Sequence, residues 1–226
     1  MGTNSVHLDG LVESCRFVGD AGGRSVAKLT VVTLHPRESS PSSRPSDSFE
    51  KITHVVRVLA DQKLAKELQS LIRDLRTERA ANEPELAVLH PCSLDGSLRT
   101  LDGDTFVDVV GKNFTLTQQV STSAGNNIAN LEGRVASCSF TDASARLNVN
   151  TKQGVVSVFF SKVANPSGWE SVSAGSVRKG DRVSLSGPLV DRVFTDGKKT
   201  QREYYLSSQV LQKLSLEKKR TSGLNL

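Results

Sequence analysis

The chain has 226 residues, of which 37% are hydrophobic, 5% aromatic and 23% charged, and this composition excludes a disordered chain. No apolar stretch approaches the roughly 18 residues needed to cross a bilayer, so we expect no membrane partner. The length suits one large domain or two of roughly 100 residues, and three cysteines without paired spacing indicate free thiols in a reducing compartment.

The net charge of +5 is concentrated in the second half of the chain. Residues 1–120 contain 14 Lys and Arg against 16 Asp and Glu, whereas residues 121–226 contain 15 against 8. A surplus of positive charge favours a polyanionic partner such as nucleic acid. The alternative is a solvated surface without such a partner.

The first half of the chain combines short β-rich segments with one helix. Apolar and β-branched residues predict strands near 5–17, 25–34, 52–60, 86–90 or 92–99, 105–110 and 113–118. The Ser- and Pro-rich stretch between the second and third strands predicts a long loop at 36–50. Leucines at three- and four-residue spacing predict a helix over 62–79, with Asp61 as its N-cap.

The second half repeats this plan with shorter connections. Strands are predicted at 128–140, 145–151, 155–163, 181–193 and 201–211. Between the third and fourth of these strands, Ser167 and Glu170 fit a capping box that starts one short helical turn. An Asp-Gly pair within 194–200 predicts a hairpin turn.

Two sequence matches identify a degenerate internal repeat. HLDGLVESCRF at 7–17 matches NLEGRVASCSF at 130–140 with an offset of 123, and SLDGSL at 93–98 matches SLSGPL at 184–189 with an offset of 91. The smaller second offset means that the first copy carries extra residues in its middle. Two copies of one supersecondary plan explain both matches. The coinciding cysteines, Cys15 and Cys138, are expected to pack as small hydrophobic side chains.

Five strands with a helix between the third and the fourth is the plan of the OB-fold, a small Greek-key barrel. The sequence therefore predicts an all-β protein with minor α content, built from two tandem five-stranded OB-fold barrels. We expect the first domain at 1–118, a linker at 119–127, the second domain at 128–214 and a basic tail at 215–226.

Three segments resemble the bacterial and mitochondrial family of single-stranded-DNA-binding proteins. They are KGDRVSLSGPLVDRVFTDGKKTQREYYLSSQVL at 179–211, the opening segment 4–10, and residues 55–66 with Lys63-Leu64-Ala65 near the helix start. Two such domains in one chain resemble the tandem members of the family, in which two chains supply four OB-folds. The resemblance implies binding of single-stranded DNA with little sequence preference. It also implies association into a homodimer or an OB-fold hetero-oligomer.

The chain departs from that family at two points. Its end, Leu216-Glu217-Lys218-Lys219-Arg220, is basic where family members usually carry an acidic recruiting tail, so recruitment through a tail is not expected. At the family's stacking positions on the third strand and the helix start, the first unit has Val55 and Asp61. We therefore expect a structural or protein-contact role for the first domain, and binding of nucleic acid mainly through the second.

The strongest candidate site is the hairpin of the second domain. Sequence-tolerant binding of single strands needs cations for phosphates and aromatic faces for bases. The hairpin places one aromatic residue among four cations: Arg192, Phe194, Lys198, Lys199 and Arg202. The alternative is a solvated hairpin whose lysines keep a sheet edge soluble.

Five further residues extend this candidate site. Phe160 and Trp169 are the additional stacking candidates, and Arg178, Lys179 and Arg182 extend the phosphate track. Because Phe159 and Phe160 are adjacent on a strand, they face opposite sides, and one of them belongs to the core. Trp169 equally suits a plug that fills the open end of the barrel.

These patterns favour binding of single-stranded nucleic acid, and they leave RNA open beside DNA because no base-edge or 2′-hydroxyl reader stands out. The rival is an OB-fold scaffold that makes protein contacts in a nucleic-acid-processing assembly, such as a mitochondrial RNA-editing complex of kinetoplastids. No catalytic, cofactor-binding or metal-ligand motif is present in the sequence. We expect no enzyme activity, no cofactor, no metal and no small-molecule substrate.

The first fifteen residues contain neither Lys nor Arg, which disfavours a secretory or transit peptide. We therefore expect an intracellular location, either in bacterial cytoplasm and nucleoid or in a mitochondrial matrix.

Overall fold

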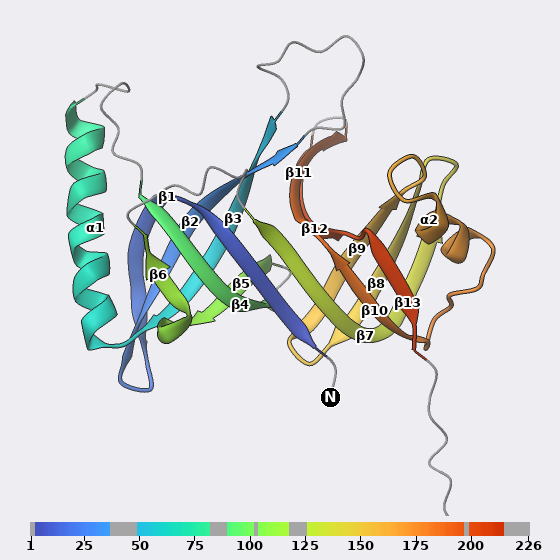
Figure 1. Ribbon diagram of the computed structural model, residues 1–226, viewed down its shortest axis with the longest axis horizontal. Coiled ribbons are helices and arrows are strands. Elements are labelled where there is room, and N and C mark those ends of the chain that lie inside the picture. The colour runs from blue at the N-terminus through green and yellow to red at the C-terminus, as the bar shows by residue number, and fades with distance from the viewer. Residues whose placement is uncertain are drawn as a thin grey trace, which may run out of the picture.

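A computed structural model describes residues 3–36, 49–81, 90–101, 104–117, 126–196 and 199–214. Its strands form one 13-stranded sheet, which closes into two barrels that stand side by side (Figure 1). Barrel one consists of β1 (Asn4–Ala21), β2 (Arg24–Pro36), β3 (Phe49–Ala60), β4 (Pro91–Leu101), β5 (Asp104–Val110) and β6 (Phe114–Leu116). Barrel two consists of β7 (Asn127–Phe140), β8 (Ser144–Thr151), β9 (Gly154–Ser161), β10 (Arg182–Gly187), β11 (Leu189–Asp196), β12 (Lys199–Ser207) and β13 (Val210–Lys213).

Each barrel closes through the same set of strand pairings. In barrel one, β1 pairs antiparallel with β2 and β4, β2 with β3, and β4 with β5, while β3 runs parallel to β5. In barrel two, β7 pairs with β8 and β10, β8 with β9, and β11 with β12, while β9 runs parallel to β12. The strand predicted at 181–193 is divided at Pro188 into β10 and β11. The prediction of two tandem OB-fold barrels is confirmed.

The helix α1 (Gln62–Ala81) covers the outer end of barrel one (Figure 1). Asp61 caps it as predicted, because its Oδ1 accepts a hydrogen bond from the backbone N–H of Leu64 at 2.9 Å. One face of the helix buries Leu64, Leu68 and Leu71 in the core, where the helix contacts β1, β2 and β3.

The helix α2 (Pro166–Ser173) lies at the outer end of barrel two (Figure 1). Its N-cap is Asn165, whose Oδ1 accepts from the backbone N–H of Gly168 at 2.9 Å. The predicted capping box of Ser167 and Glu170 is therefore wrong. Asparagine is a preferred N-cap residue, and Pro166 suits the first helical position because that position needs no N–H donor.

The two copies of the internal repeat form equivalent hydrogen bonds in the structure. The Nδ2 of Asn4 donates to the carbonyl oxygen of Leu98 at 2.9 Å, and the Oδ1 of Asn4 accepts from the backbone N–H of Leu98 at 3.0 Å. Asn127 makes the same pair of bonds with Leu189, at 2.7 and 3.0 Å. The asparagines are separated by the first offset of the repeat and the leucines by the second. We call these two arrangements the asparagine clamps.

Equivalent glycines also occupy β4 and β10, because a neighbouring strand passes too close for a side chain. A Cβ added to Gly96 would lie 2.7 Å from the carbonyl oxygen of Asp108. A Cβ added to Gly187 would collide with the carbonyl oxygen of Ser207. These contacts explain why the repeated SLDGSL and SLSGPL segments share their central glycine.

The strands β1 and β7 join the two barrels in a self-complementary way. Asn4 lies opposite Leu131 and Leu8 opposite Asn127, with Val6 and Ala129 at the centre. In the repeat, Asn4 is equivalent to Asn127 and Leu8 to Leu131. Each strand therefore presents the same edge to the other, and the two barrels are related by a pseudo-two-fold axis through this joint.

The three cysteines are free in the structure. Burial raises the pKa of Cys15 to about 11 and that of Cys92 to about 12, which keeps both thiols protonated and unreactive. Cys138 is exposed, so its predicted packing as a small hydrophobic residue is wrong.

Several predicted segments lie partly or wholly outside the described residues. These are most of the loop at 36–50, the linker at 119–127 apart from Asn126 and Asn127, and the tail at 215–226. The domain boundaries at these segments stay predictions.

Candidate nucleic-acid interface

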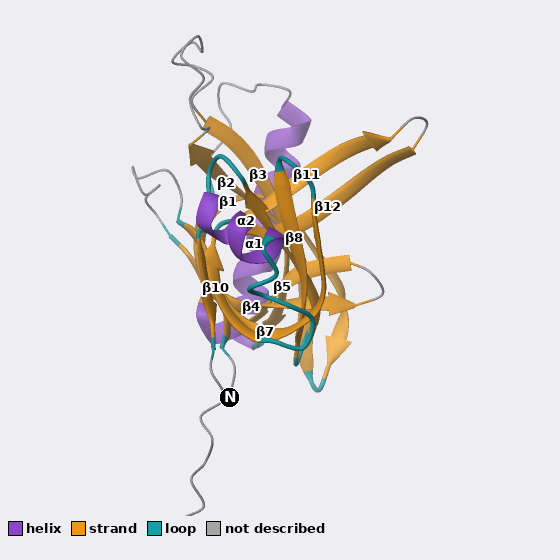
Figure 2. Cartoon of the chain, turned by 90° about the vertical axis from the view of Figure 1, so that its right-hand side faces the viewer, coloured by secondary structure: helices purple, strands orange, loops and turns teal. Residues whose placement is uncertain are grey.

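The predicted hairpin is formed by β11 and β12, which project from the side of barrel two (Figure 2). Its backbone register places Phe194 opposite Gln201 and Asp196 opposite Lys199. Lys198 lies outside the described residues, as do the side chains of Arg192, Phe194, Lys199 and Arg202. The assignment of these five residues to nucleic-acid contacts stays a prediction.

The assignment of Phe160 to base stacking is wrong for this structure. Its side chain is 0% exposed, in the core of barrel two with Val156 and Val158 on the same face of β9. The neighbouring Phe159 faces outward instead. Its ring lies 4.7 Å from the ring of Tyr205, and the guanidinium of Arg146 lies 5.5 Å from its centroid.

Trp169 packs against the core of barrel two from α2. Its indole Nε1 donates to the carbonyl oxygen of Thr141 at 2.9 Å, and the Nζ of Lys162 lies 4.2 Å from the ring centroid. Because its ring packs against the core and its indole N–H is bonded to Thr141, Trp169 suits the closing of the barrel end better than the stacking of a base.

The cations Arg178, Lys179 and Arg182 lie in and after the turn that precedes β10, at the end of barrel two remote from the hairpin (Figure 1). Arg178 donates from Nε to the carbonyl oxygen of Gly175 at 2.6 Å, and Arg182 pairs with Glu132 at 3.1 Å. The length of β10, roughly 20 Å for six residues, separates them from the hairpin. These three cations therefore lie apart from the base of the hairpin at Asp191 and Tyr204.

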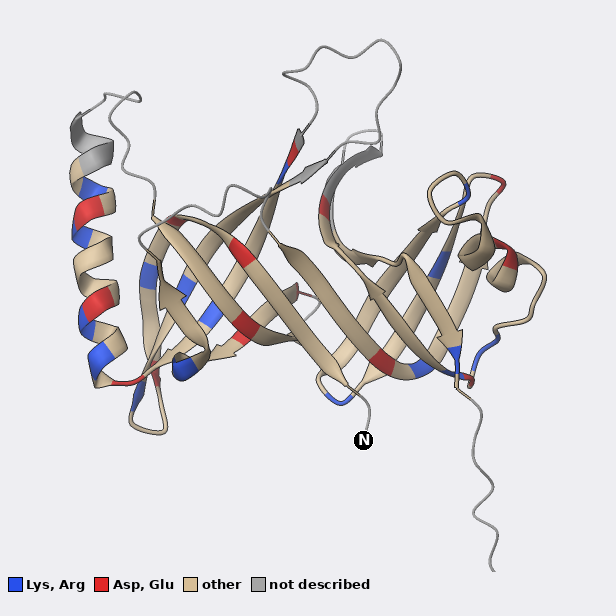
Figure 3. Ribbon diagram, in the orientation of Figure 1, with Lys and Arg blue, Asp and Glu red and all other residues tan. Residues whose placement is uncertain are grey.

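A cleft of about 670 Å³ lies between the two barrels. Barrel one contributes side chains from β1 to β5, and barrel two contributes side chains from β8, β9, β11 and β12. Asp191 and Tyr204, which stand opposite each other at the base of the hairpin, belong to its lining. The base of the hairpin predicted from the sequence therefore lies at the edge of this cleft. Figure 3 shows that charged residues of both signs occur on both barrels.

The cleft is lined by equivalent positions of the two barrels. On the second strand of each barrel, Lys28 lies opposite Arg16 and Arg146 lies opposite Ser139. Arg16 and Ser139 are separated by the repeat offset of 123, which makes Lys28 and Arg146 equivalent, and with them their partners on the third strand, Arg57 and Phe159. Both line the cleft. Further equivalent pairs in its lining are Thr53 with Val155, Val55 with Ser157, Thr100 with Asp191, and Thr105 with Tyr204. This symmetry places the cleft at the pseudo-two-fold axis.

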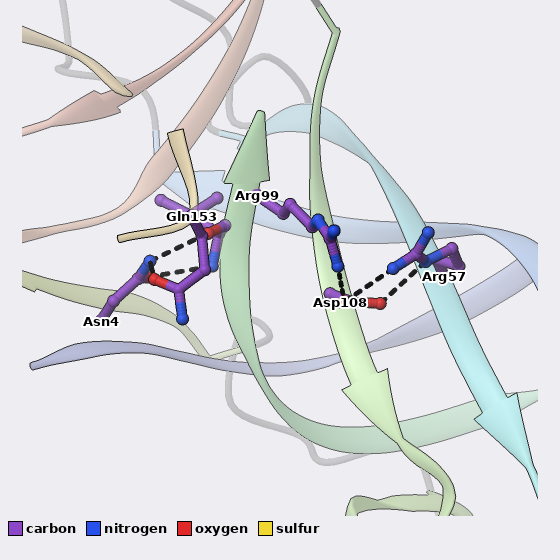
Figure 4. A network of polar contacts seen from close by, with 6 residues as sticks. Asn4, Arg57, Arg99, Asp108 and Gln153 are labelled. Carbon is purple, nitrogen blue, oxygen red and sulfur yellow. Dashed lines mark hydrogen bonds and ion pairs between the residues drawn. The ribbon is translucent and has the colours of Figure 1, made fainter. Parts of the chain in front are cut away.

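In barrel one a cation is held over an aromatic ring beside the cleft. The guanidinium of Arg57 lies 5.1 Å from the ring centroid of Phe106 and makes two hydrogen bonds of 2.8 Å to the carboxylate of Asp108. Arg99 reaches the same carboxylate at 3.3 Å (Figure 4). The hydrogen bonds from Arg57 to Asp108 raise the pKa of Arg57, so the cation is permanent and fixed in place.

A buried polar chain ties the hairpin of barrel two to barrel one. The Nδ1 of His54 lies 2.7 Å from the hydroxyl of Tyr204, and its Nε2 lies 2.7 Å from Oγ1 of Thr33. Burial lowers the pKa of His54 to about 3. The ring is therefore neutral near pH 7 and forms both contacts as a neutral donor and acceptor.

Barrel one reaches back to barrel two on the other side of the cleft. The backbone N–H of Thr100 donates to the carbonyl oxygen of Gln153 at 3.0 Å, and its hydroxyl donates to that of Val155 at 2.7 Å. Asn4 also donates to Oε1 of Gln153 at 2.7 Å (Figure 4). The β4–β5 hairpin of barrel one thus contacts barrel two, and the β11–β12 hairpin of barrel two contacts barrel one. These contacts fix the separation of the cleft walls.

Sequence reasoning missed Lys28, Arg57, Phe106 and Arg146, because their positions in the chain are far apart. Only the assembled barrels bring them together. The sequence did contain one usable signal for the outward face of β9. Ser157 and Phe159 share a face opposite to Val156, Val158 and Phe160, and the polar serine marks that face as the exposed one.

Other kinds of site are not apparent in the described segments. Within them, no group of three or more His, Cys, Asp or Glu residues is arranged to hold a metal ion. Neither is any helix in the described part of the chain long and apolar enough to cross a membrane.

Comparisons with known proteins find similarity among solved structures. No protein-family model and no curated protein matches the sequence. The wild-type single-stranded DNA binding protein of Thermus aquaticus is similar in structure, with a TM-score of 0.60 and 17% sequence identity over 95% of this chain and 94% of that one. A deletion mutant of the same protein, which also carries an arginine-to-alanine substitution, has a TM-score of 0.57 at 17% identity, over 96% of each chain. Both likenesses extend over the two barrels and show the fold.

Proposed function

We propose that the protein binds single-stranded nucleic acid, with DNA preferred and with little sequence preference. The observation that carries this proposal is the pairing of cations with aromatic rings in both barrels, on the strands that line the cleft. Arg57 lies over Phe106 in barrel one, and Arg146 lies over Phe159 in barrel two. Cations for phosphates and aromatic faces for bases are what sequence-tolerant binding of single strands requires.

Two further features support the proposal. The fold is that of proteins described as single-stranded DNA binding proteins, and the surplus of positive charge in residues 121–226 favours a polyanion. The preference for DNA rests on that likeness. The hairpin residues predicted from the sequence belong to this proposal, and the cation–aromatic pair of barrel one adds that domain to the interface.

A titration of a fluorescent oligo-dT of about 35 nucleotides tests the proposal, with duplex DNA and oligo-U as comparison ligands. We expect binding of dT to exceed binding of duplex and to weaken with salt, with a logarithmic slope of about −0.7 for each phosphate contacted. The variants Phe194→Ala and Lys198→Glu/Lys199→Glu are expected to lose affinity. Lys66→Glu, on an exposed position of α1, serves as a matched charge control.

An OB-fold scaffold is the second candidate, and one observation favours it. Two large apolar side chains, Phe140 and Val163, are 57% and 85% exposed at the end of barrel two, beside the turn at 141–143. Large apolar side chains that are exposed at one end of a barrel suit a protein contact. Weak binding that is indifferent to strand type and to the hairpin variants would favour this role over nucleic-acid binding.

A further inference from the structure

The cleft between the barrels has the chemistry of a nucleic-acid site, although its lining includes none of the predicted site residues whose side chains the structure describes: Phe160, Trp169, Arg178, Lys179 and Arg182. Its two equivalent cations, Lys28 and Arg146, come from different barrels. A linear polyanion that passes through such a cleft meets a positive charge from each barrel in turn. A compact anion bound at one wall would use only one of them.

The remaining lining suits bases better than isolated phosphate. Leu101 and Val155 are 49% and 45% exposed and, with the ring of Phe106, offer apolar surface for a base. The carboxylates of Asp104 and Asp191 also line the cleft. They repel phosphate from their own part of the cleft, and they accept hydrogen bonds from the amino groups of bases.

The walls of the cleft are held in place before any ligand arrives. The contact between His54 and Tyr204 and the hydrogen bonds of Thr100 bridge the barrels. Arg57 is fixed by Asp108. A preorganised cleft spends little binding free energy on ordering its own side chains.

We propose that a bound single strand crosses from one barrel to the other through this cleft, with phosphates on Lys28 and Arg146 and a base on the apolar surface between them. This inference rests on the proposed function and gives it a composite site that needs both barrels. It also predicts that barrel one contributes directly to binding, in contrast to the structural role expected from the sequence.

The test measures dT affinity and its salt dependence for Lys28→Ala, Arg146→Ala and the double variant. Each single change is expected to weaken binding about fivefold and to reduce the magnitude of the salt slope by about 0.7. The double variant is expected to reduce the magnitude of the slope by about 1.4. Lys66→Ala on α1 is the matched control and is expected to bind like the wild type. Lys28 is exposed, so its loss leaves the fold intact.

Arg146 donates to Ser157 at 2.9 Å and packs on Phe159, so its variant needs a second, independent measurement. We would cross-link the wild-type protein to an oligonucleotide that carries 5-iodouracil and map the modified residues. Cross-links to Phe106 or Tyr204 are expected. If the wild type binds but Lys28→Ala is neutral and cross-links avoid the cleft, the inference is overturned and the proposed function stands. If the wild type does not bind single strands, both are overturned.

Discussion

The two barrels share a backbone framework but differ in what they carry on it. Both have an asparagine clamp, a central glycine on the strand after the helix, and the same closure of strands. They differ in the helix, which has 20 residues in α1 and 8 in α2. They also differ in the side chains that point away from the two cores, since Arg57 on β3 of barrel one is equivalent to Phe159 on β9 of barrel two. Positions that satisfy buried backbone groups are shared, whereas outward positions are free to differ.

The shared glycines give the sharpest way to break this comparison. We expect Gly187→Ala to lower the free energy of unfolding by about 3 kcal/mol, because the added methyl group has no room against the carbonyl oxygen of Ser207. Gly96→Ala is expected to be nearly as costly. Chemical denaturation followed by circular dichroism and by Trp169 fluorescence measures both, with Ser184→Ala as the control in β10. A neutral Gly187→Ala would show that the strand can move away.

The asparagine clamps should rank next. Asn127→Ala leaves the N–H and the carbonyl oxygen of Leu189 without their side-chain partners, at a cost of about 2 kcal/mol. Asn4→Ala is expected to cost less, because Asn4 is only half-buried and water replaces part of the loss. Asn126→Ala, at an exposed neighbouring position, provides the control in the same denaturation experiment. An equal loss of unfolding free energy in Asn126→Ala and Asn127→Ala would show that the asparagine clamp does not stabilise the barrel.

A third test uses the histidine that connects the barrels. The pKa of His54 is lowered to about 3 in the folded protein against 6.5 when unfolded. Between these values only the unfolded chain takes up the proton, so stability falls as the pH falls, by about 1.4 kcal/mol per pH unit from this residue. His54→Gln is expected to flatten the stability profile between pH 6.5 and 5, measured by urea denaturation.

His7 provides the opposite case for that measurement. Burial by itself lowers the pKa of His7, but the hydrogen bonds and charges of Asp95 and Asp9 outweigh it and leave the pKa raised. Its contribution to stability is therefore present at low pH and is lost as the pH rises through the folded pKa. His7→Gln should change the profile in the direction opposite to His54→Gln. The same direction for both variants would contradict the buried, neutral state of His54.

The smallest effect is expected at the end of barrel two. Lys162→Ala removes the cation over Trp169 and should lower the free energy of unfolding by about 0.5 kcal/mol. Because Trp169 is the only tryptophan, its emission spectrum reports the change directly. Lys152→Ala, an exposed cation in the β8–β9 turn, is the control. An unchanged spectrum would mean that Lys162 does not rest on the ring in solution.

The framework was predictable from the sequence because its constraints are local and repeated. The two offsets located the matching glycines, and leucine spacing located α1 and its Asp61 cap. The clamps could have been found in the same way, since Asn4 and Asn127 are also separated by 123 positions. They were missed because a single matching polar residue carries little weight until its backbone partner is known.

The candidate site was less predictable because it depends on contacts between distant segments. Lys28, Arg57 and Arg146 lie on three strands of two barrels, and no periodicity connects them. The prediction of Phe160 as a stacking residue is wrong because the alternation of β9 places Phe160 on the same face as Val156 and Val158. Packing assigns the larger apolar face of β9 to the core, which leaves Phe159 outside.

The self-complementary joint between β1 and β7 has a consequence for how such a chain can be divided. An edge that fits its pseudo-symmetric counterpart also fits a second copy of itself. Two fragments obtained by cutting between Thr117 and Asn126 could therefore reassemble as unlike or as like pairs. Covalent fusion removes this competition, because a tethered partner is present at an effective concentration in the millimolar range. Once mispairing is suppressed, the halves can specialise without losing each other, and the unlike walls of the cleft are the form that such specialisation takes.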